Sequence, residues 1–421
     1  MRGKSRVSIA RKKVLEVRLG DAVGGKGMLL RIKGLFHRFN YDIEINDGEI
    51  VTITGANGFG KSTIINIINA IGNSNIRFFF QLEFEQIYVK KEEDGSPFVL
   101  RKKDSQLIYN NQTLDFREAL YFSRGIPLER IITRRNAKQT DLESIVEQKK
   151  IYDALMRDMK EIVSGVRLIR EQRVIIETEE DEEQREAVER IPEKLALEIQ
   201  NASKVYADIS SELDGSYPER LFKGQESISK DEFFFQLEEM QKKIRKLRNN
   251  GITTVRNLEI SDFKEEDAKA LAIYFKDFNK KYTAYEKLVE RIELFCDIVN
   301  KRFTFKKLVV SYEEGFEVID DTTGKRLPLD KLSSGEKEII VLFYEILFET
   351  PDETLLLIDE PEISLHISWQ RLFIRDLVRI AKHKQLTVVV ATHSPQIALG
   401  DCDKQIDLGE QYQNERFDKR K

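Results

Sequence analysis

One short segment near the start of the chain has the residue types and spacing that bind a phosphate group. Residues 55–62 read Gly-Ala-Asn-Gly-Phe-Gly-Lys-Ser and lie between a predicted apolar strand, residues 49–54, and a predicted apolar helix, residues 64–71. In that setting glycines let backbone N–H groups turn inward around phosphate oxygens, and the helix N-terminus adds partial positive charge. The residues expected around the phosphates are Gly55, Asn57, Gly58, Gly60, Lys61, Ser62 and Thr63.

Two side chains of this segment can do more than surround an anion. Lys61 can place a full positive charge between the outer phosphates, where it assists both binding and catalysis. The Ser62 hydroxyl can ligate Mg²⁺. The segment therefore predicts a site for ATP with Mg²⁺.

A second segment places two carboxylates at the end of an apolar run. Residues 355–360 read Leu-Leu-Leu-Ile-Asp-Glu, which predicts a buried strand that ends at the acids. Ligands of open α/β sheets bind at the carboxyl ends of the strands. We expect Asp359 to hold the magnesium, directly or through water, and Glu360 to polarise the attacking water as a general base. An exposed acidic strand end is the common alternative, and the glycine loop upstream favours the functional interpretation.

Two further segments are ambiguous when taken alone. Residues 332–336 read Leu-Ser-Ser-Gly-Glu, which a serine helix cap with a capping glutamate explains equally well. His393 follows a predicted buried strand, residues 386–391, and a lone histidine is usually structural. Their order after the glycine loop and around the paired carboxylates gives both a second interpretation.

In that order the four segments resemble those of ABC/SMC-type ATPases. Residues 332–336 resemble the signature sequence Leu-Ser-Gly-Gly-Gln, with Ser334 and Glu336 as departures that suit the SMC-like branch. His393 resembles the switch histidine, which senses or stabilises the γ-phosphate. The resemblance implies a head-to-tail dimer around two ATP molecules, in which each ATP contacts Lys61, Asp359, Glu360 and His393 of one subunit and the signature residues Ser333, Gly335 and Glu336 of the other.

The resemblance implies two more elements. Residues 361–366 would be the D-loop that links the two ATP sites. A glutamine should also reach the magnesium and the nucleotide. Gln81 and Gln86 are candidates nearer the glycine loop, but Gln172 is preferred because it ends the predicted strand 166–173.

Within this class the chain resembles the OLD-like group, which includes OLD nucleases and ATPase subunits of anti-phage systems such as Septu and PARIS. The resemblance lies in residues 211–221, 332–338, 358–366 and 392–396. It implies the sensor or scaffold subunit of a defence complex. OLD nucleases continue into a Toprim domain, whereas 28 residues follow His393 here, so the effector, a nuclease or toxin, is expected to be a separate chain.

The predicted fold class is α/β: an ABC/SMC-type P-loop ATPase head, with a mixed sheet that includes an antiparallel β meander, and an inserted helical, coiled-coil-like arm. Apolar residues recur with 4-3 spacing at 233–247 and again at 271–303. Such spacing predicts either helices that pair as a coiled coil or amphipathic helices buried on a core, and the longer series favours the arm. The expected domains are residues 1–175 (first half of the head), 176–304 (arm) and 305–421 (second half).

Composition narrows the remaining options. No apolar stretch approaches the roughly 18 residues of a membrane helix, and two unclustered cysteines make neither a disulfide framework nor a zinc site. A cytoplasmic protein without a membrane partner is expected. The net charge of -4 neither requires nor excludes nucleic acid. Basic runs at 101–103, 134–135 and 242–248 keep DNA as a candidate partner, and with it the alternative of a RecF- or SMC-like DNA repair ATPase. A solvated helix face is the commoner explanation of such runs.

Overall fold

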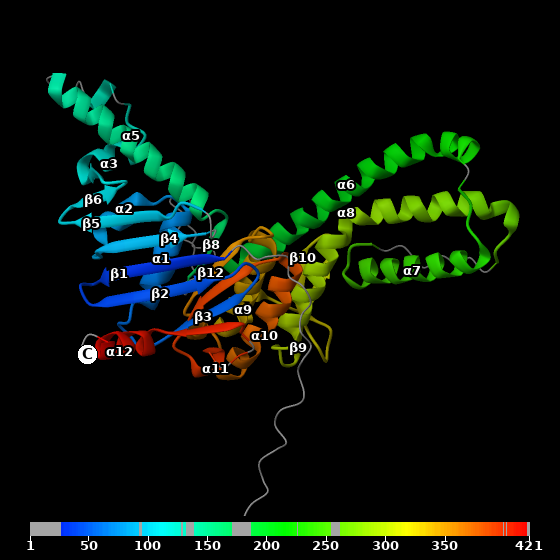
Figure 1. The fold of residues 1–421 in the computed structure, drawn as a ribbon. Coiled ribbons are helices and arrows are strands. Elements are labelled where there is room, and N and C mark those ends of the chain that lie inside the picture. The colour runs from blue at the N-terminus through cyan, green and yellow to red at the C-terminus, as the bar shows by residue number, and fades with distance from the viewer. Residues whose placement is uncertain are drawn as a thin grey trace, which may run out of the picture. The chain divides into compact units, whose positions relative to one another are not determined.

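The computed structural model describes residues 27–91, 95–127, 129–131, 139–170, 187–224, 226–253, 262–398, 400 and 402–418. The chain folds as two compact units (Figure 1). The first unit comprises Met1–Asp47 and Phe80–Asp158, and the second comprises Gly48–Phe79 and Met159–Lys421. All four segments singled out in the sequence belong to the second unit. Gln172, residues 134–135 and the acidic run 177–186 lie outside the described residues.

The first unit is built on a six-stranded antiparallel sheet in the order β2-β1-β4-β5-β6-β7. Alternating burial along β1 and β2 places one face of the sheet on the core. The pair Asn110-Asn111 is a turn signal in the sequence. Both residues have positive φ, as a tight hairpin turn requires, and they join β6 to β7. The strands are β1 (Met28–Leu35), β2 (Phe39–Ile45), β4 (Gln86–Lys90), β5 (Phe98–Lys103), β6 (Gln106–Tyr109) and β7 (Gln112–Asp115). Helix α3 (Phe116–Ser123) and most of α5 (Gln139–Ile162) belong to the same unit.

The sequence patterns of residues 35–45 and of residues 78–90 each predict a strand, and the structure corrects both predictions. Residues 35–45 are not one strand, because Phe36 and His37 adopt positive φ in a turn between β1 and β2. Gly, Asn and Asp are the residues that usually mark such a turn, and neither Phe36 nor His37 is one of them. Residues 78–81 are helical, in α2 (Ile76–Gln81), and the strand begins only at Gln86.

The second unit contains a five-stranded parallel sheet in the order β14-β3-β13-β12-β8. Its central strands are almost wholly buried, as expected when helices cover both faces. The strands are β3 (Ile50–Thr54), β8 (Val166–Ile169), β12 (Leu355–Asp359), β13 (Thr387–Ala391) and β14 (Lys404–Asp407). The helices are α1 (Lys61–Gly72), α9 (Ser334–Tyr344), which continues as a π-helical turn over Glu345–Glu349, α10 (Ile367–Lys384), α11 (Pro395–Ala398) and α12 (Leu408–Asp418).

A helical arm is inserted between β8 and the rest of this unit. It consists of α6 (Ala187–Lys223), α7 (Lys230–Asn249) and α8 (Ala268–Asn300), with a short 3₁₀ helix over Glu265–Asp267 before α8 (Figure 1). The buried face of α7 carries every member of the first 4-3 series: Phe233, Leu237, Met240, Ile244 and Leu247.

The second 4-3 series divides between two environments. Near the start of α8, Phe275 packs with Phe233 and Leu237 of α7 in a small separate cluster. From Tyr282 onward the buried residues of α8 join the large core that also contains α6, α9 and the parallel sheet. Both interpretations of the spacing therefore apply, each to one half of the helix. The predicted fold class, a mixed α/β head with an antiparallel meander and an inserted helical arm, is confirmed.

The root of the arm touches a small antiparallel sheet of β9 (Lys306–Ser311), β10 (Gly315–Asp320) and β11 (Arg326–Leu327). A Cβ on Gly315 would lie 1.9 Å from the Pro192 carbonyl oxygen in α6. A Cβ on Gly251, just after α7, would lie 2.1 Å from the Val310 carbonyl oxygen in β9. Backbone therefore meets backbone at both places, and only glycine fits there.

Candidate active site

The glycine loop joins β3 to α1 in the expected way. Gly58 and Gly60 have φ of 88° and 83°, a region that L side chains rarely adopt. Gly60 caps α1 without a side-chain hydrogen bond, and the first turn of α1 holds no acidic residue. The first-turn N–H groups thus have no side-chain acceptor from a cap, and the helix end presents positive partial charge. The N-terminus of α1 is therefore suited to bind an anion such as a phosphate.

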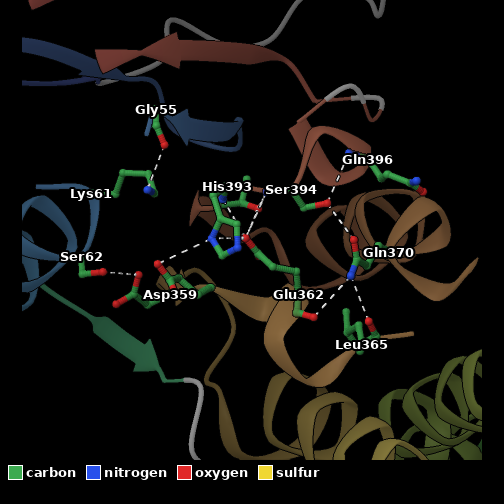
Figure 2. A network of polar contacts seen from close by, with 12 residues as sticks. Gly55, Lys61, Ser62, Asp359, Glu362, Leu365, Gln370, His393, Ser394 and Gln396 are labelled. Atoms are coloured by element: carbon green, nitrogen blue, oxygen red, sulfur yellow. Dashed lines mark hydrogen bonds and ion pairs between the residues drawn. The ribbon is translucent and has the colours of Figure 1, made fainter. Parts of the chain in front are cut away.

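Lys61 lies across the loop that it follows. Its side chain is buried, and its Nζ donates to the carbonyl oxygens of Gly55 at 3.0 Å and Ala56 at 3.5 Å (Figure 2). Both acceptors are uncharged, so neither contact offsets the positive charge that the ammonium group brings to the loop. Asn57 lies within the loop, and Thr63 lies in the first turn of α1.

A hydrogen bond connects the loop to the paired carboxylates. The Ser62 hydroxyl donates to Asp359 Oδ1 at 3.0 Å, although the two residues are 297 positions apart in the sequence (Figure 2). The parallel pairing of β3 with β13 and of β13 with β12 brings the two strand ends to the same edge of the sheet. A hydroxyl and a carboxylate in contact are hard oxygen donors of the kind that Mg²⁺ takes.

The small number of ligands that Ser62 and Asp359 supply also suits Mg²⁺. Within the described ranges no group of three or more His, Cys, Asp or Glu residues could hold a metal by itself. Protein sites for Mg²⁺ usually supply one or two oxygens and leave the rest to phosphates and water. Ser62 and Asp359 match that arrangement.

Glu360 has an unusual backbone. Its φ and ψ are 45° and 55°, in the left-handed region, at the point where β12 ends and a 3₁₀ helix over Pro361–Ser364 begins. Its N–H donates to the Ala391 carbonyl oxygen at 2.9 Å, which fixes it to the end of β13. A non-glycine residue in this conformation costs about 1–2 kcal/mol. Such strain concentrates at active sites, where the surrounding structure enforces it.

His393 lies between two glutamates. Its Nδ1 is 3.8 Å from Glu360 Oε1 and 3.1 Å from Glu362 Oε1. The ring is partly exposed, whereas the Glu362 side chain is 4% exposed. The structure thus brings the predicted histidine beside the predicted base. It also adds Glu362, which the sequence offered only as a member of the D-loop segment.

The signature segment forms a capping box at the start of α9. Ser333 Oγ accepts from the N–H of Glu336, and Glu336 Oε2 accepts from the N–H of Ser333 at 2.8 Å. Lys306, the first residue of β9, donates to both oxygens of Glu336 at 3.0 and 2.8 Å. Burial alone would raise the pKa of Glu336, but these hydrogen bonds outweigh it, so the pKa lies below its ordinary value. Gly335 follows in the first turn of α9.

The alternative glutamines occupy other places. Gln81 ends α2, and Gln86 accepts a hydrogen bond from Arg101 Nε at 3.1 Å within the first unit. The preferred candidate, Gln172, is among the residues outside the described ranges, so its expected role stays a prediction.

One comparison with known proteins identifies a family of ATPases. The family described as AAA ATPase domain matches residues 32–398. A comparison with curated proteins finds no match. Within the described ranges, none of the helices is long and apolar enough to cross a lipid bilayer.

A comparison with solved structures finds three SMC head domains among its matches, at low sequence identity. They are the SMC head bound to the C-terminal winged-helix domain of ScpA (13% identity, TM-score 0.37, 91% of this chain and 93% of that one), the SMC head with an extended coiled coil from Pyrococcus furiosus, bound to the C-terminal domain of ScpA (16%, 0.36, 91% and 92%), and the SMC head domain from Thermotoga maritima (12%, 0.36, 91% and 94%).

Proposed function

This chain belongs to the AAA ATPase domain family, and we propose that it binds ATP with Mg²⁺ and hydrolyses it at the site built by residues 55–62, Asp359, Glu360 and His393. The observation that carries the proposal is the hydrogen bond from Ser62 to Asp359. It joins the phosphate-binding loop to the strand end that carries the proposed base. Phosphate binding and water activation can then take place in one site.

The residues divide the work as follows. The glycine loop and Lys61 bind the phosphates. Ser62 and Asp359 would hold Mg²⁺, which, when bound, neutralises negative charge on the phosphates. Glu360 accepts a proton from the attacking water. His393 lies beside Glu360, and its ring supplies a polar nitrogen to the same site.

Equilibrium binding and turnover together test this assignment. Binding of a fluorescent ATP analogue is measured with and without Mg²⁺, and phosphate release is measured in parallel. We expect Lys61→Ala to weaken binding in both conditions, and Asp359→Asn to remove the part of the affinity that depends on Mg²⁺. A wild-type protein that neither binds nor hydrolyses ATP would refute the proposal.

We propose further that the active form is a dimer of heads around ATP. The resemblance of residues 332–336 to a signature sequence supports it, because that sequence acts on the ATP of the opposite subunit. Ser333 and Gly335 would meet the ATP of the partner copy. Glu336 is held by Lys306 and Ser333 in this structure, so we assign it to shaping the start of α9.

At the level of biological role, we propose the sensor or scaffold subunit of an anti-phage defence complex that controls a separate effector. Support comes from the resemblance of residues 211–221, 358–366 and 392–396 to the OLD-like group. A pull-down of the native protein with its genomic neighbours, followed by mass spectrometry, tests it. Recovery of a nuclease or toxin is the expected outcome, and recovery of DNA repair proteins alone would contradict it.

Direct DNA binding is the alternative, and the arm gives it little support. In α7, Lys242 pairs with Glu238 at 2.9 Å and Lys246 pairs with Glu293 at 3.0 Å. Lys243 donates to Asn279 Oδ1 at 2.7 Å. These basic side chains are therefore engaged within the arm. A strong decrease of DNA affinity with salt would revive the alternative, since phosphate contacts release counterions.

A further inference from the structure

A buried carboxylate holds the loop that carries His393. Glu362 Oε1 accepts hydrogen bonds from Thr392 Oγ1 at 2.7 Å, from the His393 N–H at 2.7 Å and from the Ser394 N–H at 3.1 Å (Figure 2). Three donors converge on a single oxygen of a side chain that is 4% exposed. The donors come from a segment some thirty residues further along the chain. The contact therefore fastens the segment after β12 to the segment after β13.

Glu362 places a polar side chain in a buried environment. A buried carboxylate is unfavourable unless it is paired or hydrogen-bonded. Its second oxygen, Oε2, is buried without a hydrogen-bond partner. Among the described residues, the basic side chain recorded within 4 Å of Glu362 is the His393 ring, whose Nδ1 lies 3.1 Å from Oε1. A side chain placed only to fill space would be apolar here.

A second side chain spans the same two segments. Gln370, on α10, donates from Nε2 to the Leu365 carbonyl oxygen at 2.9 Å and to the Glu362 carbonyl oxygen at 3.3 Å. Its Oε1 accepts from the Ser394 hydroxyl at 2.7 Å. The backbone around Glu362 and the loop around His393 are thus tied together at two points (Figure 2).

We propose that Glu362 is a positioning residue, which sets the place and the tautomer of the His393 ring through its hold on residues 392–394. A carboxylate facing Nδ1 makes that nitrogen the donor and leaves the lone pair of the neutral ring on Nε2. The ring is then fixed beside Glu360. This inference rests on the proposed ATPase function only for its effect on turnover. The hold on the ring itself is independent of ATP.

The test combines a spectroscopic and a kinetic measurement. The full chain has four histidines, so selective isotope labelling of the imidazoles gives few resonances, and His393→Gln assigns the one of interest. Glu362→Gln keeps the shape and an acceptor oxygen but removes the charge. We expect the His393 resonances to move away from the Nδ1–H pattern. We expect kcat for ATP to fall about tenfold to a hundredfold, the range known for carboxylates that orient metal-bound histidines, while KM stays within about twofold.

Glu290→Gln is the matched control. Glu290 Oε2 lies 3.5 Å from His383 Nδ1, which is also a carboxylate–imidazole contact but lies on α8 and α10 away from the glycine loop. This variant should shift the resonances of His383 and leave those of His393 and the turnover unchanged. If Glu362→Gln does not fold, Thr392→Val removes one of the three donors from the other side and is read by the same measurements.

The outcomes separate clearly. Unmoved His393 resonances in a folded Glu362→Gln protein would overturn the inference, whatever the turnover. Moved resonances with unchanged kcat would overturn the role in the reaction. If the wild-type protein hydrolyses no ATP, the proposed function fails, and the resonances alone still decide whether Glu362 holds the ring.

Discussion

Glu360 combines a chemical role with a strained backbone, and substitutions can separate the two. Glu360→Gln removes the base but keeps the length of the side chain and the left-handed backbone at φ 45°. General-base catalysis contributes about 10²- to 10⁴-fold, so turnover should fall by at least a hundredfold. ATP affinity should stay within a few-fold, because the phosphates are held by the glycine loop. The stability should change little, because the backbone strain is unaltered.

The strain is measured by comparing glycine with alanine at the same position. Both Glu360→Gly and Glu360→Ala lack the carboxylate, so they differ mainly in backbone preference. A left-handed residue with a Cβ costs about 1–2 kcal/mol, and the greater freedom of glycine in the unfolded chain offsets about 0.5–1 kcal/mol of that. Glu360→Gly should therefore be the more stable of the two by about 0.5–1 kcal/mol. Calorimetric or denaturant unfolding under matched conditions measures the difference.

Two results would refute this reasoning. Turnover of Glu360→Gln within tenfold of the wild type would show that another group accepts the proton. A Glu360→Ala protein more stable than Glu360→Gly by about 0.5–1 kcal/mol, which is the backbone-entropy difference alone, would show that the backbone at this position is not strained. A trapped dimer of Glu360→Gln with ATP, seen by light scattering, would in addition support the proposed sandwich of heads.

Three further predictions address the signature helix, the arm root and the pH dependence. Ser333→Arg should block ATP-dependent dimerisation without weakening ATP binding to the monomer. Ser333→Asn retains a capping side chain, so it should reduce dimerisation less. Equal dimerisation of both variants in light scattering would count against the sandwich. Gly315→Ala should lower the free energy of unfolding more than Gly324→Ala does. Both glycines have positive φ, but only at Gly315 would the new Cβ lie 1.9 Å from a carbonyl oxygen. Equal unfolding free energies of the two variants would contradict the close approach. Burial and the nearby Arg291 lower the pKa of Lys384 to about 8, and in the unfolded chain it returns to about 10.4. The unfolded state then binds the extra proton between these values, so stability should rise as the pH increases from about 8 to about 10.4, and Lys384→Met should flatten that rise in denaturant titrations.

The elements that carry the chemistry were readable because their signals are local. Residues 55–62 combine glycines with a lysine and a serine at fixed offsets, and apolar runs flank them. The capping box at Ser333 and Glu336 is likewise a pattern of four consecutive residues, and the structure contains it. Patterns of this kind depend on backbone geometry over one turn, so they survive without knowledge of the fold.

The features that sequence reasoning missed depend on contacts between distant segments. The contacts of Glu362 depend on the pairing of β12 with β13, because the groups that donate hydrogen bonds to its side chain follow β13. The 4-3 series of α8 gave the correct buried face but not its partners, since an arm helix and a core helix share that spacing over short lengths. At the turn between β1 and β2, Phe36 has φ of 53° although it is a bulky side chain for which positive φ is rare.

The two glycine contacts at the root of the arm have a mechanical consequence. Side chains can yield to a load by changing rotamer, but backbone pressed on backbone cannot. A load on α6 or α7 is therefore passed through Pro192 and Gly251 to the hairpin of β9 and β10. Lys306, at the start of β9, donates a hydrogen bond to Glu336, so the same load reaches the cap of α9. A load on the arm is in this way connected to the capping box that Glu336 forms with Ser333.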